Sequence, residues 1–337
     1  MQADRRIRGI LAALALAAPL ALPAGVGAQA GAGPVAANGN TVEVVANYVE
    51  TPTSFAWGDG TMFVGKGPSL PNFGPGGLDT IVHGVATAVP NGPADVYGLA
   101  WHDGSLYVST GLTIIKMGGW NGTAFATIAT VYTDSSPSFN GFSGIAFGPD
   151  GRLYAGLLAK EPDYDHAKDP YPLSQSIVSM NANGTGLRFI ARGIRQPFQL
   201  HFPAGSRYPF VSDLGQDAGG PIPPDEILVA KPGQNYGFPT CTWRATQTTA
   251  CRRFTKPRIL LPQHASPMGI SSIRNTLYVA LYSGVGQSGP EVVKIPTGGG
   301  HLTPFVTGFS SPIISLSVED GYIYIGEQSG TIYRVYS

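Results

Sequence analysis

The chain has 337 residues and a formal net charge of +0, and only 12% of its residues are charged. Such low and balanced charge argues against nucleic acid or an anionic membrane surface as a partner. Apolar residues make up 43% of the chain, which argues against disorder. With 46 glycines and 29 prolines, the composition favours many short strands joined by tight turns.

The first thirty residues have the pattern of a secretory signal peptide. Three arginines within the first eight residues precede an apolar run over Gly9–Leu22, and the small-x-small sequence Ala28-Gln29-Ala30 follows. The apolar run is too short to span a bilayer. We therefore predict cleavage near Ala30, a mature domain over residues 31–337, and a secreted or periplasmic location without a membrane span. Export through the general or the twin-arginine route stays open.

One short pattern recurs six times along the mature chain. Each copy is an apolar strand, a turn and a second apolar strand; the turns are tight and rich in Asp, Asn and Gly, except for a longer turn in the fourth copy. Such turns tolerate the positive φ that a two-residue hairpin requires. The copies are Phe55–Gly65, Leu99–Ser109, Ile145–Ala155, Leu200–Val211, Ile270–Val279 and Leu316–Gly326.

The spacing of the copies is typical of a β-propeller. Most copies begin about 45 residues apart, the length of one four-stranded blade, and two intervals are longer. We predict an all-β, six-bladed β-propeller in which the last strand, Gly330–Val335, pairs with an N-terminal strand near Thr41–Val45 and closes the ring. A β-sandwich is the alternative, but a sandwich does not require a near-constant period.

The segment Arg192–Pro239, in which charged, amide, aromatic and glycine residues gather, is the first candidate for a functional site. Arg195 and Gln196 precede a strand, and a Gly/Pro-rich loop carries Asp225 and Glu226. Loops at one mouth of a propeller carry function because the sheets are a rigid scaffold. Insertions at Leu158–Pro172 and Cys241–Pro262, together with the opening stretch of the mature chain, mark the expected functional mouth.

The two cysteines, Cys241 and Cys251, lie in one loop of the exported part of the chain. In an oxidising compartment this arrangement favours a local disulfide. A metal pair is the alternative, although no further Cys or His lies at zinc spacing.

Several motifs resemble those of soluble quinoprotein glucose/sorbosone dehydrogenases. The matching segments are Gly148–Tyr154 (G-P-D-G-R-L-Y), Gly193–Pro197 (G-I-R-Q-P), Asp225–Ile227, Pro232–Pro239 (P-G-Q-N-Y-G-F-P) and, for the sorbosone branch, Cys241–Cys251 with His264–Gly269. The turn N-Y-G-F-P after D-E is the most specific of these. The resemblance covers the chain well from Phe139 to its end, and the first two blades match only by the repeat.

This resemblance implies a six-bladed propeller that binds pyrroloquinoline quinone (PQQ) and Ca²⁺ and oxidises sugars at C1. Arg195 would pair with a quinone carboxylate, as a planar guanidinium can. Backbone carbonyls of Gly215 and Gln216 would hold the calcium ion, since hard oxygen donors suit it. Glu226 matches a structural calcium ligand, and His264 would face the channel beside the cofactor.

The chain also departs from the family pattern. Asn140 occupies the position of the general-base histidine, and an amide cannot accept the substrate hydroxyl proton. Gln196 replaces the Asn of the turn, and Phe198 stands where an amide residue is expected. The Gly-Asp pair that usually follows the third hairpin is absent.

Other candidate residues have simpler interpretations. We expect His102 in a hairpin turn and His201 at a strand edge, without a catalytic role. Asp163, Asp165 and His166 can form a metal site, but a solvated insertion loop is the simpler interpretation. We expect Tyr236 and Phe238 to fix their turn by packing.

The leading prediction is a PQQ- and calcium-dependent oxidoreductase of an aldose or related alcohol, with an unidentified electron acceptor and Arg195, His264 and the Asn140 position at the catalytic centre. One alternative is a catalytically inactive propeller that binds carbohydrate or a cell-surface partner. Another is a metal-dependent propeller hydrolase or lactonase, which needs Asp, Glu, Asn or His side chains that converge on the axis.

Overall fold

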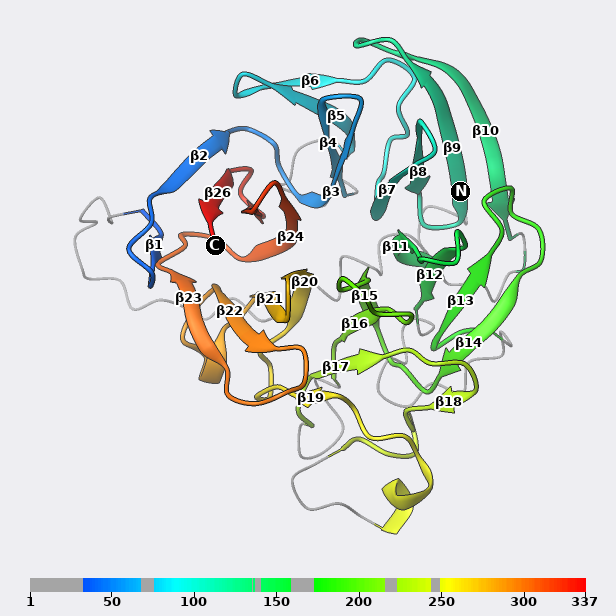
Figure 1. Ribbon diagram of the computed structural model, residues 1–337, viewed down its shortest axis with the longest axis vertical. Helices are drawn as coiled ribbons and strands as arrows, with labels where there is room; N and C mark the ends of the chain where they lie inside the picture. The colour runs from blue at the N-terminus through cyan, green and yellow to red at the C-terminus, as the bar shows by residue number, and fades with distance from the viewer. Residues whose placement is uncertain are drawn as a thin grey trace.

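The computed structural model describes residues 33–67, 76–134, 136, 141–158, 173–215, 223–243 and 249–337. Six sheets of four or five strands stand around one axis (Figure 1). Within the described part of the chain there are two short 3₁₀ helices, η1 (Thr249–Arg253) and η2 (Val285–Gln287), and no α-helix. The predicted all-β, six-bladed propeller is therefore confirmed.

Each blade is a meander whose strands run from the axis outward, and we number the blades in chain order. Blade 1 is β3 (Pro52–Gly58), β4 (Thr61–Lys66), β5 (Gly77–Val82) and β6 (Val85–Ala88); blade 2 is β7 (Gly98–His102), β8 (Ser105–Ser109), β9 (Thr113–Trp120) and β10 (Phe125–Thr133); blade 3 is β11 (Phe142–Phe147), β12 (Leu153–Leu157), β13 (Ser176–Met180) and β14 (Arg188–Arg192) with β18 (Gln234–Asn235) at its edge. Blade 4 is β15 (Pro197–His201), β16 (Phe210–Asp213), β17 (Glu226–Val229) and β19 (Ile259–Leu260); blade 5 is β20 (Pro267–Ile273), β21 (Thr276–Leu281), β22 (Glu291–Pro296) and β23 (Thr303–Thr307) with β1 (Val35–Ala36) at its edge; blade 6 is β24 (Ile313–Glu319), β25 (Tyr322–Glu327), β26 (Ile332–Tyr336) and β2 (Val42–Ala46).

All six predicted repeats form the inner hairpin of a blade. In blade 1 the turn residues Asp59 and Gly60 have φ of 47° and 71°, and in blade 6 Asp320 and Gly321 have φ of 49° and 79°. Both central residues of these turns are left-handed, as a type I′ hairpin requires. The turn chemistry thus determines where each blade begins.

The ring closes through blade 6, where the two ends of the domain meet. β2 pairs antiparallel with β26, with Val42 opposite Val335 and Glu43 opposite Arg334 (Figure 1). The Arg334 guanidinium lies 2.7 Å from the Glu43 carboxylate across this pair. The predicted closure is confirmed, while the pairing of β1 with β23 of blade 5 was not foreseen.

Neighbouring blades pack through their inner strands, which contact one another in ring order. A Cβ added to Gly144 of β11 would lie 2.7 Å from the Phe198 carbonyl of β15, and one at Gly269 of β20 would lie 2.4 Å from the Leu316 nitrogen of β24. Glycine in a strand interior allows such close approach of a second backbone. Apolar clusters then fill the space between adjacent sheets, as between blades 4 and 5.

The predicted signal peptide lies outside the described residues, so export stays a prediction. Among the described residues, no helix combines the length and the apolar character needed to cross a membrane.

Candidate active site at one mouth of the propeller

Each blade begins its first strand and ends its second strand at the same end of the axis, which we call the mouth. The pairs Pro52–Lys66, Pro197–Asp213 and Pro267–Leu281 mark this end in blades 1, 4 and 5. The ladder shifts register just after each of these pairs. Such bulges bend a strand and redirect its side chains, and they are common beside active sites.

Arg195 lies at the mouth, directly before β15, and it is buried, with 4% of its surface exposed. Its guanidinium donates hydrogen bonds to the carbonyl oxygens of Leu214, at 3.3 Å, and of Gly215. The predicted cation and the predicted calcium ligand are therefore in direct contact.

Asp213, at the end of β16, fixes the backbone of this turn. Its carboxylate accepts hydrogen bonds from the amide of Arg195 at 3.2 Å and from that of Gln196 at 2.7 Å. Burial raises the pKa of Asp213 to about 7, although these hydrogen bonds and the Arg195 charge act in the opposite direction.

Asp225 joins the Gly215 loop to the turn that carries His264. One carboxylate oxygen accepts a hydrogen bond from the Gly215 amide at 2.6 Å, and the other accepts one from the Ser266 amide at 2.7 Å. His264 and Ser266 adopt positive φ of 55° and 54° within this turn. A single buried carboxylate thus joins two predicted parts of the site, the Gly215 loop and the turn that carries His264.

A small pocket with a volume of about 20 Å³ lies beneath these residues, and Arg195, Asp213, Gly215, Glu226 and Tyr236 are among its lining residues. This volume suits about one water molecule. Glu226 is buried within it, and burial followed by the nearby Asp213 and Asp225 carboxylates raises its pKa well above the usual range.

The predicted turn of residues 235–239 supports the site from below. The amide of Phe238 donates to the Gly193 carbonyl at 3.1 Å, and the Tyr236 hydroxyl donates to the Gln234 side chain at 2.8 Å. Gly193 has φ of +68°, and a Cβ there would lie 2.3 Å from Oδ1 of Asn235. Only glycine therefore fits between this turn and Arg195.

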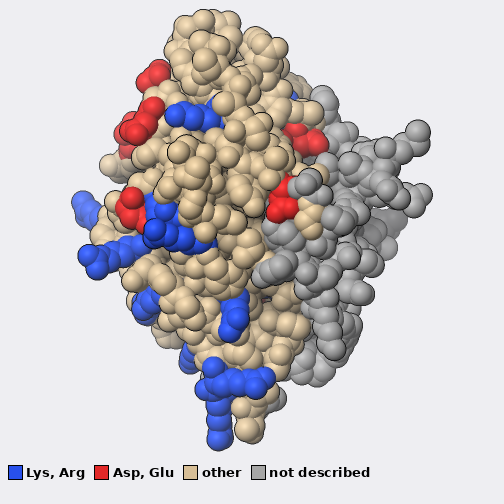
Figure 2. All heavy atoms as spheres, turned by 90° about the vertical axis from the view of Figure 1, so that its right-hand side faces the viewer, with Lys and Arg blue, Asp and Glu red and all other residues tan. Residues whose placement is uncertain are grey.

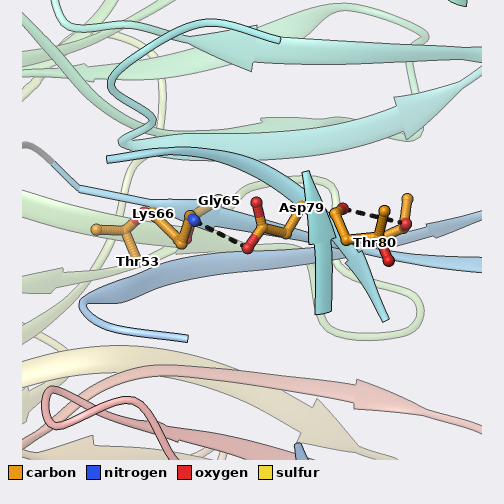
Figure 3. Close-up of polar contacts among 6 residues, drawn as sticks. Thr53, Gly65, Lys66, Asp79 and Thr80 are labelled. Atoms are coloured by element: carbon orange, nitrogen blue, oxygen red, sulfur yellow. Dashed lines mark hydrogen bonds and ion pairs between the residues drawn. The ribbon is translucent and has the colours of Figure 1, made fainter. Parts of the chain in front are cut away.

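A second cation lies at the mouth in blade 1, but it is already paired. The Lys66 Nζ is 2.9 Å from Oδ2 of Asp79; the Asp79 side chain is buried and the Lys66 side chain is partly buried (Figure 3). The hydroxyl of Thr53 beside them donates to the carbonyls of Val96, at 2.6 Å, and Gly65, at 3.1 Å. Sequence reasoning missed this pair, because Lys66 and Asp79 stand on separate strands of an ordinary repeat.

The remaining predicted site residues fall into three groups. Asn140, Gln216 and the acidic loop with Asp163, Asp165 and His166 lie outside the described residues. Gln196 is at the mouth, 2% exposed, and its Oε1 has no hydrogen-bond partner among the described residues. His102 and His201 end the strands β7 and β15 at the opposite end, as expected.

The residues around the predicted departures have structural partners. Phe198 packs in an apolar cluster with Met268 and Ile314. The Gln199 amide bridges two blades, since it donates to the Leu316 carbonyl at 3.2 Å and accepts from the Ile270 amide at 2.7 Å.

The predicted disulfide is confirmed, since Cys241 and Cys251 are bonded with a Cα–Cα distance of 5.1 Å. Trp243 is buried against this disulfide and donates from its indole to the Tyr236 carbonyl at 2.5 Å. The disulfide loop therefore anchors to the turn beneath Arg195.

The fold and this mouth define a six-bladed propeller with a polar site at one end of its axis. The chain is similar in structure to a protein from Thermus thermophilus described as an oxidoreductase (glucose dehydrogenase), with a TM-score of 0.71 and 21% identity over 88% of this chain and 100% of the other. It is also similar to the PQQ-bound aldose sugar dehydrogenase of Streptomyces coelicolor, with a TM-score of 0.69 and 20% identity over 88% and 98%.

A gluconolactonase from Xanthomonas campestris matches more distantly, with a TM-score of 0.60 and 13% identity over 94% of this chain and 99% of the other. No protein-family model and no curated protein sequence matches the chain. At these identities the likeness establishes the shared fold, in agreement with the resemblance seen in the sequence motifs.

Proposed function

We propose that the protein is a PQQ-dependent dehydrogenase of aldoses or related sugar alcohols, with its active site at the mouth. The observation that carries the proposal is the Asp225 carboxylate, which holds the Gly215 loop and the His264 turn together beside Arg195. The solved structures of sugar dehydrogenases with this fold support it.

The described residues fit an anionic, planar quinone. Arg195 supplies a planar cation for a carboxylate or quinone oxygen. Gln196 supplies a buried amide oxygen without a partner among the described residues, and such an atom requires a donor from water or a ligand. Both residues are adjacent in the chain and lie at the start of β15.

Fewer of the described residues are suited to bind calcium. The Gly215 carbonyl can serve as a ligand, but it also accepts a hydrogen bond from Arg195, and the positive charge of the guanidinium disfavours a cation beside it. Within the described ranges, no group of three Asp, Glu, His or Cys side chains is arranged to hold a metal. Calcium binding therefore depends on backbone oxygens of the Gly215 loop and on the cofactor itself.

When bound, the quinone would accept a hydride from C1 of the sugar. Arg195 then orients the anionic cofactor and stabilises negative charge on it. The sugar hydroxyl must lose a proton, and Asn140 has no basic nitrogen for this step. His264 is the proposed acceptor, because an imidazole nitrogen can accept a proton and its turn is fixed to the Gly215 loop.

The test is reconstitution of the purified protein with PQQ and Ca²⁺, followed by dye reduction with a panel of aldoses. We expect turnover in the wild type and a loss of at least about 100-fold in kcat for His264→Gln, the usual range for a general base. His301→Gln is the matched control, because His301 is exposed in the β22–β23 connection at the opposite end. Equal turnover in His264→Gln and His301→Gln would show that His264 is not the proton acceptor.

A non-enzymatic propeller that binds carbohydrate is the second candidate. The observation that favours it is Asn140 at the position of the base, together with a guanidinium that is bonded to backbone carbonyls. It predicts sugar binding at the mouth without any quinone binding, so a titration with PQQ separates the two candidates. In either case we infer export from the predicted signal peptide.

A further inference from the structure

A second cavity, with a volume of about 570 Å³, lies at the end of the propeller opposite the mouth. Its walls come from blades 3 and 4: the β11–β12 turn with Pro149 and Asp150, the start of β14 with Arg188, the β15–β16 connection with Arg207 and the β17–β18 turn with Pro232. We call it the lower groove. No residue of the proposed active site lines it.

Two arginines in the lower groove lack partners. Arg188 and Arg207 are exposed, and neither side chain has a hydrogen bond or an ion pair among the described residues. Arg152 in the same groove differs, because its guanidinium bonds to the Ser179 hydroxyl at 3.0 Å and to the Asn181 side chain at 2.6 Å. The groove therefore presents two cations whose donors are available to a ligand.

Aromatic side chains lie beside these cations. Phe189 has 39% of its surface exposed, although it is a large apolar residue on a strand. Tyr208 and Tyr154 also line the groove, and the Tyr154 hydroxyl donates to Oδ2 of Asp150 at 3.0 Å. Asp150 is the one acidic residue among the lining residues, and its carboxylate accepts the hydrogen bond from Tyr154. The groove thus combines ring faces with guanidinium groups.

The surface around the lower groove carries positive charge, as the two groove arginines do. Among the described residues of blades 3 and 4, Asp150 is the one exposed acid. Of the exposed bases there, Arg188, Arg207 and Lys231 lie at the same end of the blades as the groove. Figure 2 shows Lys and Arg along the lower part of one side of the molecule, and both Lys or Arg and Asp or Glu along its left edge. The described bases at this end of the blades would attract an anion to the groove, although the whole chain has a formal net charge of +0.

We propose that the lower groove binds an acidic saccharide, with carboxylates on Arg188 and Arg207 and a sugar ring against Phe189 or Tyr208. Its volume lies in the range of small-ligand sites, about 300–1,000 Å³. Guanidinium groups pair with carboxylates in planar geometry, and an exposed ring offers an apolar face to a sugar. A concave site of this size suits one or two sugar rings better than the flat surface of a protein partner.

The test uses the full-length mature protein and digalacturonate as the probe, with calorimetric titration at low and high salt. We expect binding that weakens by about tenfold for Arg188→Gln or Arg207→Gln, which corresponds to the loss of one charge-assisted hydrogen bond. Binding should also weaken as salt rises to 0.3 M. Arg192→Gln is the matched control, because this exposed arginine lies at the mouth end of the same strand, β14.

Other outcomes overturn the proposal. One is the absence of digalacturonate binding at 10 mM, on the order of the weakest useful affinities. Another is that the neutral disaccharide of galactose binds as tightly as digalacturonate. The third is that Arg192→Gln weakens digalacturonate binding as much as Arg188→Gln or Arg207→Gln does. Binding of polyglutamate without binding of digalacturonate would assign the groove to an acidic protein instead. Both arginines are exposed and unbonded, so the variants should keep the wild-type melting temperature, and PQQ binding at the mouth should be unchanged.

Discussion

The most informative perturbation of the mouth is Asp225→Asn. The Asp225 carboxylate is 4% exposed and accepts two backbone hydrogen bonds, from Gly215 and Ser266. Asparagine has the same shape but one acceptor oxygen, so one of these amides would face an NH₂ group. A hydrogen bond to a buried charge contributes about 1.5–3 kcal/mol, and the substitution also removes repulsion with Glu226. We therefore expect a net loss of about 2 kcal/mol in the free energy of unfolding.

The assay is urea unfolding with the linear extrapolation of the free energy, together with titration of PQQ in the presence of Ca²⁺. We expect a lower urea midpoint with an unchanged slope and weaker cofactor binding, because the Gly215 loop and the His264 turn separate. Asp320→Asn is the control, since Asp320 is exposed in a β24–β25 turn whose positive φ asparagine tolerates. Wild-type stability and wild-type binding in Asp225→Asn would refute this explanation of the site.

Three further predictions test other parts of the structure. Gly193→Ala should destabilise the protein by several kcal/mol, because its Cβ would lie 2.3 Å from Asn235, whereas Gly205→Ala, with φ of +78° and open space around it, should cost about 1 kcal/mol in urea unfolding. Burial lowers the pKa of His201 to about 4, so the unfolded chain binds more protons than the folded chain between about pH 6.5 and 4. The free energy of unfolding should therefore decrease, by at most about 3 kcal/mol, as the pH is lowered through that window. His201→Gln should keep the hydrogen bond to Ser272 and lose that part of the pH dependence of the free energy of unfolding, and an unchanged pH profile would contradict it. In calorimetric titrations without quinone, Ca²⁺ should bind weakly to the wild type and more tightly to Arg195→Gln, because the substitution frees the Gly215 carbonyl. Arg192→Gln should bind Ca²⁺ as the wild type does.

The inner hairpins could be predicted from sequence because their information is local. In blades 1, 2 and 6, two consecutive turn residues with positive φ between two apolar strands define the hairpin without reference to the rest of the chain. Apart from the pairing of β2 with β26, the outer strands could not be predicted in the same way. β18 and β19 have two residues each, and they pair with strands distant in sequence, so no periodic pattern marks them.

The candidate site was predicted in part for a similar reason. Arg195, Gly215 and His264 were identified by motifs, and the structure places the Gly215 loop and the His264 turn together beside Arg195. The carboxylates that hold them could not be assigned, since the hydrogen bonds of Asp213 and Asp225 to backbone amides cross 10 to 41 residues. An Asp at the end of a buried strand, followed by a glycine loop, was the available signal for Asp213.

The lower groove could not be predicted from the sequence, because it also depends on segments that are distant along the chain. Its walls come from four turns and strand ends that are separated along the chain, and each contains only ordinary turn residues. The three-dimensional arrangement alone shows that Arg188 and Arg207 line the same cavity without partners among the described residues.

The measurement that tests the central claim most directly is equilibrium binding of PQQ, in the presence of Ca²⁺, to the wild type, to Arg195→Gln and to Arg192→Gln. The proposed site predicts micromolar binding to the wild type and to Arg192→Gln, and a loss of at least about tenfold for Arg195→Gln, because a charge-assisted contact is removed. No binding to the wild type, or equal binding to all three proteins, would contradict the assignment of the mouth as a quinone site.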